Sequence, residues 1–199
     1  MSTASLSALA SLPGVYTLAM PRAGGEKCPL VLDSPHSGAE LPPDFAYVCQ
    51  EADLRASADT GVDRLIAQAP ECGATVLLAD VARAYLDLNR ALDDLDPALC
   101  ADAPPWPVHP TKRTQFGLGL IHTRAGGQTI YAAPLPAHTI ARRVTAYYAP
   151  YHACLQALVA AQRDAFGQAL HLNIHAMPSM TIEGKLLPDI VIGDLDGTA

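Results

Sequence analysis

Two histidines far apart in the sequence each follow a short apolar run and stand beside proline and small residues. His36 lies in SPHSG (34–38), directly after the run that ends at Asp33. His175 follows the mostly apolar run 169–174. Ligands of α/β proteins gather at the carboxyl ends of strands, so the two side chains could share one site. Two histidines and a carboxylate, with one position left for water, are a common ligand set of zinc hydrolases.

Three carboxylates are candidates for the remaining ligand. Asp59 and Asp63 lie four residues apart in SADTGVD and would share one face of a helix, where like charges repel unless a cation or a donor compensates them. Either could bind the metal, although Asp63 could equally be a solvated or capping residue. Glu40 lies close to His36 in sequence and is more typical of a surface loop. Each histidine taken alone could instead make ordinary hydrogen bonds at a strand end.

The segment RAYLDLNR (83–90) carries a third group of polar side chains. In an extended conformation, Arg83, Tyr85, Asp87 and Asn89 would share one face. The planar guanidinium groups of its two arginines suit carboxylates, and the acidic and amide side chains could orient them. A structural ion pair at a strand end explains the same residues equally well.

Serines and a third histidine are further candidates for catalysis. Ser34 and Ser37 flank His36, but the sequence has no GxSxG motif, and a nucleophile beside its own base rarely has suitable geometry. His152 lies just after Pro150, where the proline should kink a helix. Taken alone, His152 is more typical of a hydrogen-bonded helix residue than of a catalyst.

The first half of the chain predicts a strand–helix–strand unit. The apolar run 28–32 predicts a strand, residues 53–69 have helical periodicity, and ATVLLA at 74–79 predicts a second buried strand. This order favours two parallel strands joined by a crossover.

The second half predicts a long loop region followed by a helix and two strands. Residues 93–136 are rich in Pro, Gly, Asp and Thr, with a short strand near 119–123. Apolar residues at helical spacing predict a helix over 137–166, and strands are expected at 169–174 and 189–192. The whole order indicates an α/β sandwich.

Composition bounds the size and the partners of the protein. Its 199 residues suit a single domain over 1–199, and with 50% hydrophobic and 17% charged residues the chain should be globular. A net charge of −7 without a basic cluster argues against nucleic acid and anionic membranes as partners. A small anionic substrate would depend on local arginines.

Five cysteines without a CxxC pair favour a reducing cytoplasm over a disulfide framework. The oligomeric state is not determined by these features.

Six motifs in order resemble the N-formylglutamate amidohydrolase family, whose members belong to the zinc-carboxypeptidase-like α/β class. They are SPHSG at 34–38, DTGVD at 59–63, RAYLDLNR at 83–90, YYAPYH at 147–152, HAMPS at 175–179 and DIVIGDLDGT at 189–198.

The resemblance implies a three-layer α/β sandwich, like that of zinc peptidases, with a mostly parallel central sheet. It also implies a zinc-dependent hydrolase of histidine degradation that cleaves the N-formyl amide of N-formyl-L-glutamate to formate and glutamate. His36, Asp59 and His175 would bind the zinc or another divalent metal, with Asp63 and Glu40 as alternative ligands. The alternatives to this function are a deacylase or amidase acting on another N-acyl amino acid or small peptide, and a catalytically impaired binding protein.

The resemblance also suggests roles for the remaining polar residues. Arg83 and Arg90 would bind the substrate's carboxylates and take part in catalysis, together with His152. Ser37 and Asn89 would contact the substrate.

This sequence departs from the family pattern at two points. It has Asn173 where relatives often have aspartate. Relatives usually continue after the GDLDGT motif with a segment that carries a glutamate and an arginine, and that glutamate would be the natural general base. The sequence ends at Ala199, so the chain is expected to lack those C-terminal elements.

Overall fold

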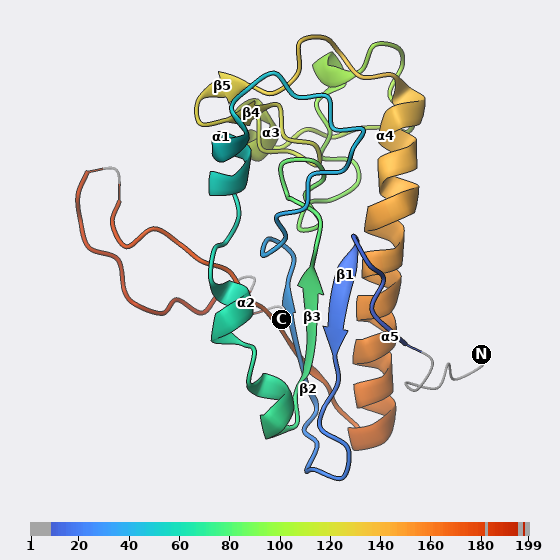
Figure 1. Cartoon of the computed structure of the whole chain (residues 1–199), viewed down its shortest axis with the longest axis vertical. Helices are drawn as coiled ribbons and strands as arrows, with labels where there is room; N and C mark the ends of the chain where they lie inside the picture. Colours follow the sequence, from blue (N-terminus) through green and yellow to red (C-terminus); the bar gives the residue numbers. More distant parts are fainter. Residues whose placement is uncertain (1–8, 182, 195–196, 198–199) are drawn as a thin grey trace.

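A four-stranded sheet forms the centre of the protein in the computed structural model, which describes residues 9–181, 183–194 and 197 (Figure 1). Across the sheet the strand order is β1-β3-β2-β6, with β1 antiparallel to β3 and the other pairs parallel. The strands are β1 (Tyr16–Ala19), β2 (Leu30–Ser34), β3 (Thr75–Ala79) and β6 (Leu170–Asn173). The predicted parallel pair of β2 and β3 is confirmed, whereas the short edge strand β1 was not predicted. The fold is therefore mixed α/β with a mostly parallel sheet.

One long helical column runs along the sheet (Figure 1). It consists of α4 (Ala137–Arg143), a π-helical turn (Val144–Tyr148) and α5 (Ala149–Phe166), which confirms the helix predicted over these residues. The π turn immediately precedes Pro150, which lies in the first turn of α5. Proline has no N–H to donate to the preceding turn, and the turn before it has the wider hydrogen-bond spacing of a π-helix.

The two faces of the sheet are covered by different elements because successive strand residues point to opposite sides. On one face, Val31 and Leu77 belong to the large core cluster that includes Tyr151 and Leu158 of α5. On the other face, a smaller cluster is formed by Leu32, Val76 and Ile66. Both faces of β2 and β3 are therefore buried, which explains why these strands read as continuous apolar runs.

The prediction of a single helix over residues 53–69 is wrong. The structure has three short pieces instead: α1 (Glu51–Ala56), α2 (Val62–Leu65) and a 3₁₀ helix (Ala69–Cys72). The break before α2 contains Gly61 with φ = +90°, a conformation that favours glycine. Asp59 consequently lies in a loop and does not share a helix face with Asp63.

The extended, alternating interpretation of residues 83–90 is also wrong. The segment is a series of turns, closed by the Tyr85 N–H donating to Ala82 and the Arg90 N–H donating to Asp87. Tyr85, expected on the same face as the polar residues, is buried in the core instead. Turns let consecutive side chains of this segment reach both the core and the polar site.

The loop region 93–136 contains only short elements. The strand expected near 119–123 is reduced to one isolated bridge between Leu118 and His122. A small hairpin of β4 (Arg124–Ala125) and β5 (Gln128–Thr129) follows it. The other elements of the region are a 3₁₀ helix (Pro97–Leu99) and α3 (Lys112–Gln115).

The strand predicted at residues 189–192 does not form. Ile190 and Ile192 are 80% and 86% exposed, within a segment that loops away from the sheet (Figure 1). The apolar pattern alone cannot form a strand there, because a strand also needs a paired neighbour. Among the described residues, no helix combines the length and the apolar character needed to span a bilayer.

The core cluster around α5 predicts a large cost for truncating Leu77. Leu77 is 0% exposed, so Leu77→Ala should lower the free energy of unfolding by about 2–5 kcal/mol through lost burial and the resulting cavity. The matched control is Leu65→Ala, since Leu65 is 74% exposed and should change stability by about 0.5 kcal/mol or less. Equal losses in urea unfolding of the two variants would contradict the assigned core.

Candidate metal centre

The turn after β2 is fixed against the chain that follows β3. Gly38 is required there, since a Cβ atom at this position would lie 2.3 Å from the carbonyl oxygen of Val81. Beside it, the Glu40 N–H donates to the Asp80 carbonyl at 2.9 Å. These contacts explain the glycine in SPHSG and hold His36 in one place at the carboxyl end of β2.

Main-chain hydrogen bonds also join the other two segments to this strand end. The Asp59 N–H donates to the His36 carbonyl at 2.9 Å. The Ile174 N–H donates to the Asp33 carbonyl at 2.8 Å, which extends the pairing of β2 and β6 to the residue before His175. Three segments that are distant in sequence are thus brought together by their backbones.

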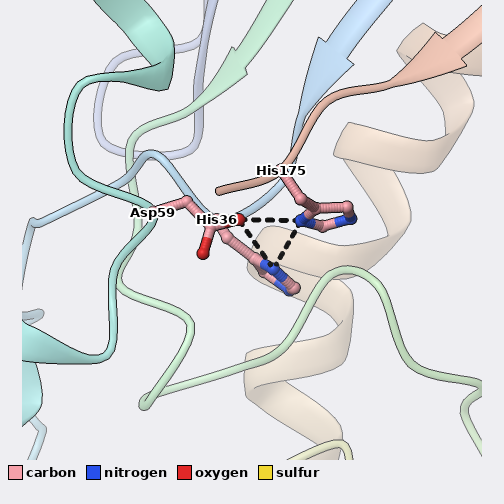
Figure 2. A group of neighbouring side chains, drawn as sticks. All are labelled: His36, Asp59 and His175. Atoms are coloured by element: carbon pink, nitrogen blue, oxygen red, sulfur yellow. Dashed lines mark hydrogen bonds and ion pairs between the residues drawn. The ribbon is translucent and has the colours of Figure 1, made fainter. Parts of the chain in front are cut away.

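His36, Asp59 and His175 form a compact triad at this point (Figure 2). The His175 Nδ1 lies 2.8 Å from the Asp59 Oδ2 and 3.1 Å from the His36 Nδ1, and the third edge, between the His36 Nδ1 and the Asp59 Oδ2, measures 3.6 Å. Ligands of a tetrahedral zinc ion, bound at about 2.0–2.1 Å, lie about 3.3–3.4 Å from one another. The three atoms therefore match one face of such a tetrahedron.

A hydrogen bond on the outer side of His36 directs a lone pair of that ring into the triad. The His36 Nε2 lies 2.7 Å from Oδ1 of Asp87, and because a carboxylate only accepts, this nitrogen carries the proton. In the neutral ring the Nδ1 lone pair then faces the triad. The His175 Nε2 lies 3.0 Å from Nδ2 of Asn89, which donates, so the proton of His175 is on Nδ1 and faces Asp59; a metal bound at Nδ1 would replace that proton. The donor set thus fits a divalent metal.

Asp59 is held in its anionic form. Burial raises its pKa, but the hydrogen bond from His175 and the nearby His36 ring outweigh burial and bring the pKa well below the usual range. The Arg83 Nη1, 3.6 Å from the Asp59 Oδ1, adds a positive charge on the opposite side. An anionic carboxylate between two imidazoles is the charge distribution expected of a metal ligand.

Asp87 is the most connected polar side chain of the site and is completely buried. Its Oδ1 accepts from the His36 ring at 2.7 Å and from the Asn89 N–H at 2.9 Å. Its Oδ2 accepts from Arg83 and from His122, both at 3.1 Å. Burial raises the pKa of Asp87, but the hydrogen bonds from His122 and His36 dominate and lower it far below its ordinary value.

His122 belongs to this network and was missed in the sequence. Its side chain is 2% exposed, and its Nδ1 has no hydrogen-bond partner among the described residues. Burial lowers the pKa of His122. The available signal was the apolar stretch LGLI (118–121) directly before it, the same pattern that singled out the other two histidines.

Three other predicted site residues make contacts outside the triad. The Ser37 hydroxyl donates to the Ser34 carbonyl at 3.1 Å, within the turn. The Arg90 Nε donates to the Leu118 carbonyl at 3.1 Å and lies 3.9 Å from Asp87. The His152 Nε2 donates to the Leu88 carbonyl at 2.9 Å, which connects α5 to the 83–90 segment.

The alternative carboxylate ligands do not join the triad in the structure. Glu40 and Asp63 are both exposed and line a separate open cavity of about 1150 Å³, together with Ser37 and Gly38. Of the three candidate carboxylates, the structure brings only Asp59 to the two histidines.

Two histidines at the ends of parallel strands and a carboxylate from the loop between α1 and α2 define a candidate metal centre of the kind found in α/β metallohydrolases. A sequence model of the N-formylglutamate amidohydrolase family matches residues 28–199. This chain therefore belongs to the N-formylglutamate amidohydrolase family.

Individual relatives agree with this family. The chain is similar to N-formylglutamate deformylases of Pseudomonas aeruginosa (29% identical, 87% of this chain and 62% of the relative) and Pseudomonas putida (26%, 87% and 61%). A crystal structure of N-formylglutamate amidohydrolase from Ralstonia eutropha JMP134 superposes with a TM-score of 0.79 at 42% identity, covering 83% of this chain and 59% of that one. A structure from Agrobacterium tumefaciens shares the fold, with a TM-score of 0.60, 19% identity, and coverage of 87% and 60%. The chain spans about three fifths of the length of these relatives.

The triad predicts which aspartate is needed for metal binding. Asp59→Asn removes one of the three proposed metal ligands. It should therefore weaken zinc binding by more than the roughly 10–100-fold loss that follows removal of a residue hydrogen-bonded to a ligand. Asp63→Asn is the matched control, since Asp63 lies outside the triad, and it should bind zinc like the parent. Competition with a chromophoric chelator measures both affinities. Loss of binding in the Asp63 variant alone would contradict the triad.

Burial of neutral His122 predicts a pH-dependent contribution to stability. Because folding lowers its pKa, the folded state binds fewer protons below about pH 6.5, the ordinary histidine value, and stability falls as the pH drops through that range. His122→Gln retains a donor toward Asp87 but cannot titrate.

The stability advantage of the parent over His122→Gln should therefore shrink between pH 7.5 and pH 5, as measured by urea unfolding at a series of pH values. The same substitution at exposed His138 controls for the replacement itself. An advantage that stays constant or grows on acidification would contradict a neutral, buried His122.

Proposed function

We propose that this chain hydrolyses the N-formyl amide of N-formyl-L-glutamate, using a zinc ion or a related divalent metal held by His36, Asp59 and His175. The observation that carries the proposal is the triad, whose three ligand atoms have the spacing of a tetrahedral face. Membership in the N-formylglutamate amidohydrolase family and the names of the relatives support the substrate. We extend the proposal to a three-layer architecture like that of zinc peptidases.

Three protein ligands would leave one position of a tetrahedral metal for water. When bound, the metal would supply an activated water and polarise the formyl carbonyl. Asp59 contributes a negative charge and the two imidazoles contribute none, so the ligand set leaves a net positive charge at the site. Asp87 keeps the proton of His36 on Nε2, and Asn89 contacts the outer nitrogen of His175. Each histidine thus has a neighbour that sets its orientation.

Two arginines are suited to the substrate's carboxylates. Their side chains are 17% (Arg83) and 16% (Arg90) exposed, and both lie beside Asp87. Arg83 also lies 3.6 Å from Asp59, so we propose that it binds the carboxylate nearer to the reacting amide and stabilises charge that develops there. We propose that Arg90 binds the second carboxylate.

The remaining predicted residues have contacts that support indirect roles. Asn89 orients the His175 ring and can also reach the substrate. We propose that His152 positions the 83–90 segment through the Leu88 carbonyl, and that Ser37 supports the turn beside His36. The substrate is then a small anionic N-acyl amino acid. The five free cysteines agree with the reducing cytoplasm that we propose as the compartment.

Formate release tests the proposed reaction directly. The zinc-loaded chain is incubated with N-formyl-, N-acetyl- and N-succinyl-L-glutamate, and formate and glutamate are quantified. Glutamate and formate from the N-formyl compound alone would support the proposal. Turnover of only another acyl compound would indicate a different deacylase, and tight substrate binding without turnover would indicate a binding protein. Either result would overturn the proposed reaction.

The proposed role of Arg83 predicts an effect on substrate binding. Arg83→Lys keeps the charge but loses the planar pair of donors, so KM for N-formyl-L-glutamate should rise about 10–100-fold, as expected for a lost charge-assisted hydrogen bond. Zinc affinity should be measured in parallel, to separate substrate binding from damage to Asp87 and Asp59. Arg163→Lys, on the exposed side of α5, is the matched control. An unchanged KM in Arg83→Lys would contradict the role.

A further inference from the structure

Two cysteines lie side by side at the end of the sheet opposite the metal centre. Cys28 precedes β2 and Cys72 precedes β3, and the two are separated by 44 residues. Cys72 is the last residue of the 3₁₀ helix Ala69–Cys72, so the two cysteines lie just before the paired part of the strands, which begins at Val31 and Thr75. The Cys28 N–H donates to the Gly73 carbonyl at 3.1 Å, which holds the main chain of Cys28 against the Cys72–Gly73 segment.

The spacing and exposure of this pair suit a covalent bond. The Cys28 Sγ already lies 3.8 Å from the Cys72 carbonyl oxygen. This contact places the two residues side by side, as a disulfide requires, since it spans Cα atoms about 4.4–6.8 Å apart. Cys72 is exposed and Cys28 is partly exposed, so both thiols are accessible to a small oxidant. By contrast, Cys154 is buried in the core.

We propose that Cys28 and Cys72 form a reversible intramolecular disulfide when a low-molecular-weight disulfide such as oxidised glutathione is present. The exposed Cys72 thiolate attacks one sulfur of the oxidant, which breaks the S–S bond and releases one reduced glutathione. The Cys28 thiolate then attacks the sulfur of Cys72 and releases the second. Two protein thiols are oxidised, one glutathione disulfide is reduced to two thiols, and the two protein protons are transferred to the released thiolates.

The disulfide would close a loop that contains two members of the triad. His36 and Asp59 both lie between the two cysteines, so the bond restricts the unfolded chain across the segment that supplies them. For a loop of this length, the melting temperature should rise on the order of 10 °C. Because β2 separates the disulfide from the metal centre, zinc affinity should be the same in the oxidised and reduced proteins.

Mass spectrometry of the whole chain tests the proposal and does not depend on the proposed hydrolase activity. The reduced protein is incubated with oxidised glutathione, measured intact without a reductant, and mapped by proteolysis. The parent should lose the mass of two hydrogens, yield a linked peptide containing Cys28 and Cys72, and regain the original mass after reduction. The variants Cys28→Ser and Cys72→Ser should instead retain a glutathione on the remaining thiol.

Three results would overturn the proposal. One is a parent protein that keeps bound glutathione on Cys72 without resolving it. The second is a linked peptide containing Cys49 or Cys100 in place of either partner. The third is an oxidised parent whose melting temperature is no higher than those of the reduced parent and of the two serine variants.

Discussion

A single buried carboxylate organises the polar centre of this protein. Asp87 accepts hydrogen bonds from His36, Asn89, Arg83 and His122, and it has no exposure to solvent. A buried charge is costly unless it is fully paired, so each of these donors is held in place by the cost of leaving Asp87 unpaired. The same pairing fixes the proton of His36 on its outer nitrogen. The turn that buries Asp87 therefore determines that the lone pair of the other His36 nitrogen points into the triad.

The sheet brings the ligands together through its backbone. β2 and β6 are parallel neighbours, and each is followed closely by one of the two histidines. The loop between α1 and α2 adds Asp59 through a main-chain hydrogen bond to His36. The chain after β3 leads to Arg83 and Asp87. Four segments thus converge at one edge of the sheet, where α/β proteins commonly build their sites.

Local patterns in the sequence were sufficient to predict the strands β2 and β3, the long helix with its break at Pro150, and the shared location of the two histidines. They failed where tertiary contacts decide the structure. The helical periodicity around Asp59 did not reveal the break at Gly61, and the alternation in 83–90 placed Tyr85 on the wrong side. His122 was missed because its role depends on Asp87, a partner 35 residues away that only the fold brings near. An apolar run likewise did not produce a strand at 189–192, because strand formation also requires a neighbour.

The central claim is that His36, Asp59 and His175 bind one metal ion. X-ray absorption at the zinc edge, on the chain loaded with one equivalent of zinc, tests it most directly. We expect a first shell of nitrogen and oxygen atoms at about 2.0–2.2 Å, with the multiple scattering of two imidazole rings, and loss of one ring in His175→Ala. Sulfur scattering at about 2.3 Å, which would indicate cysteine ligands, or a spectrum unchanged in His175→Ala, would contradict the claim.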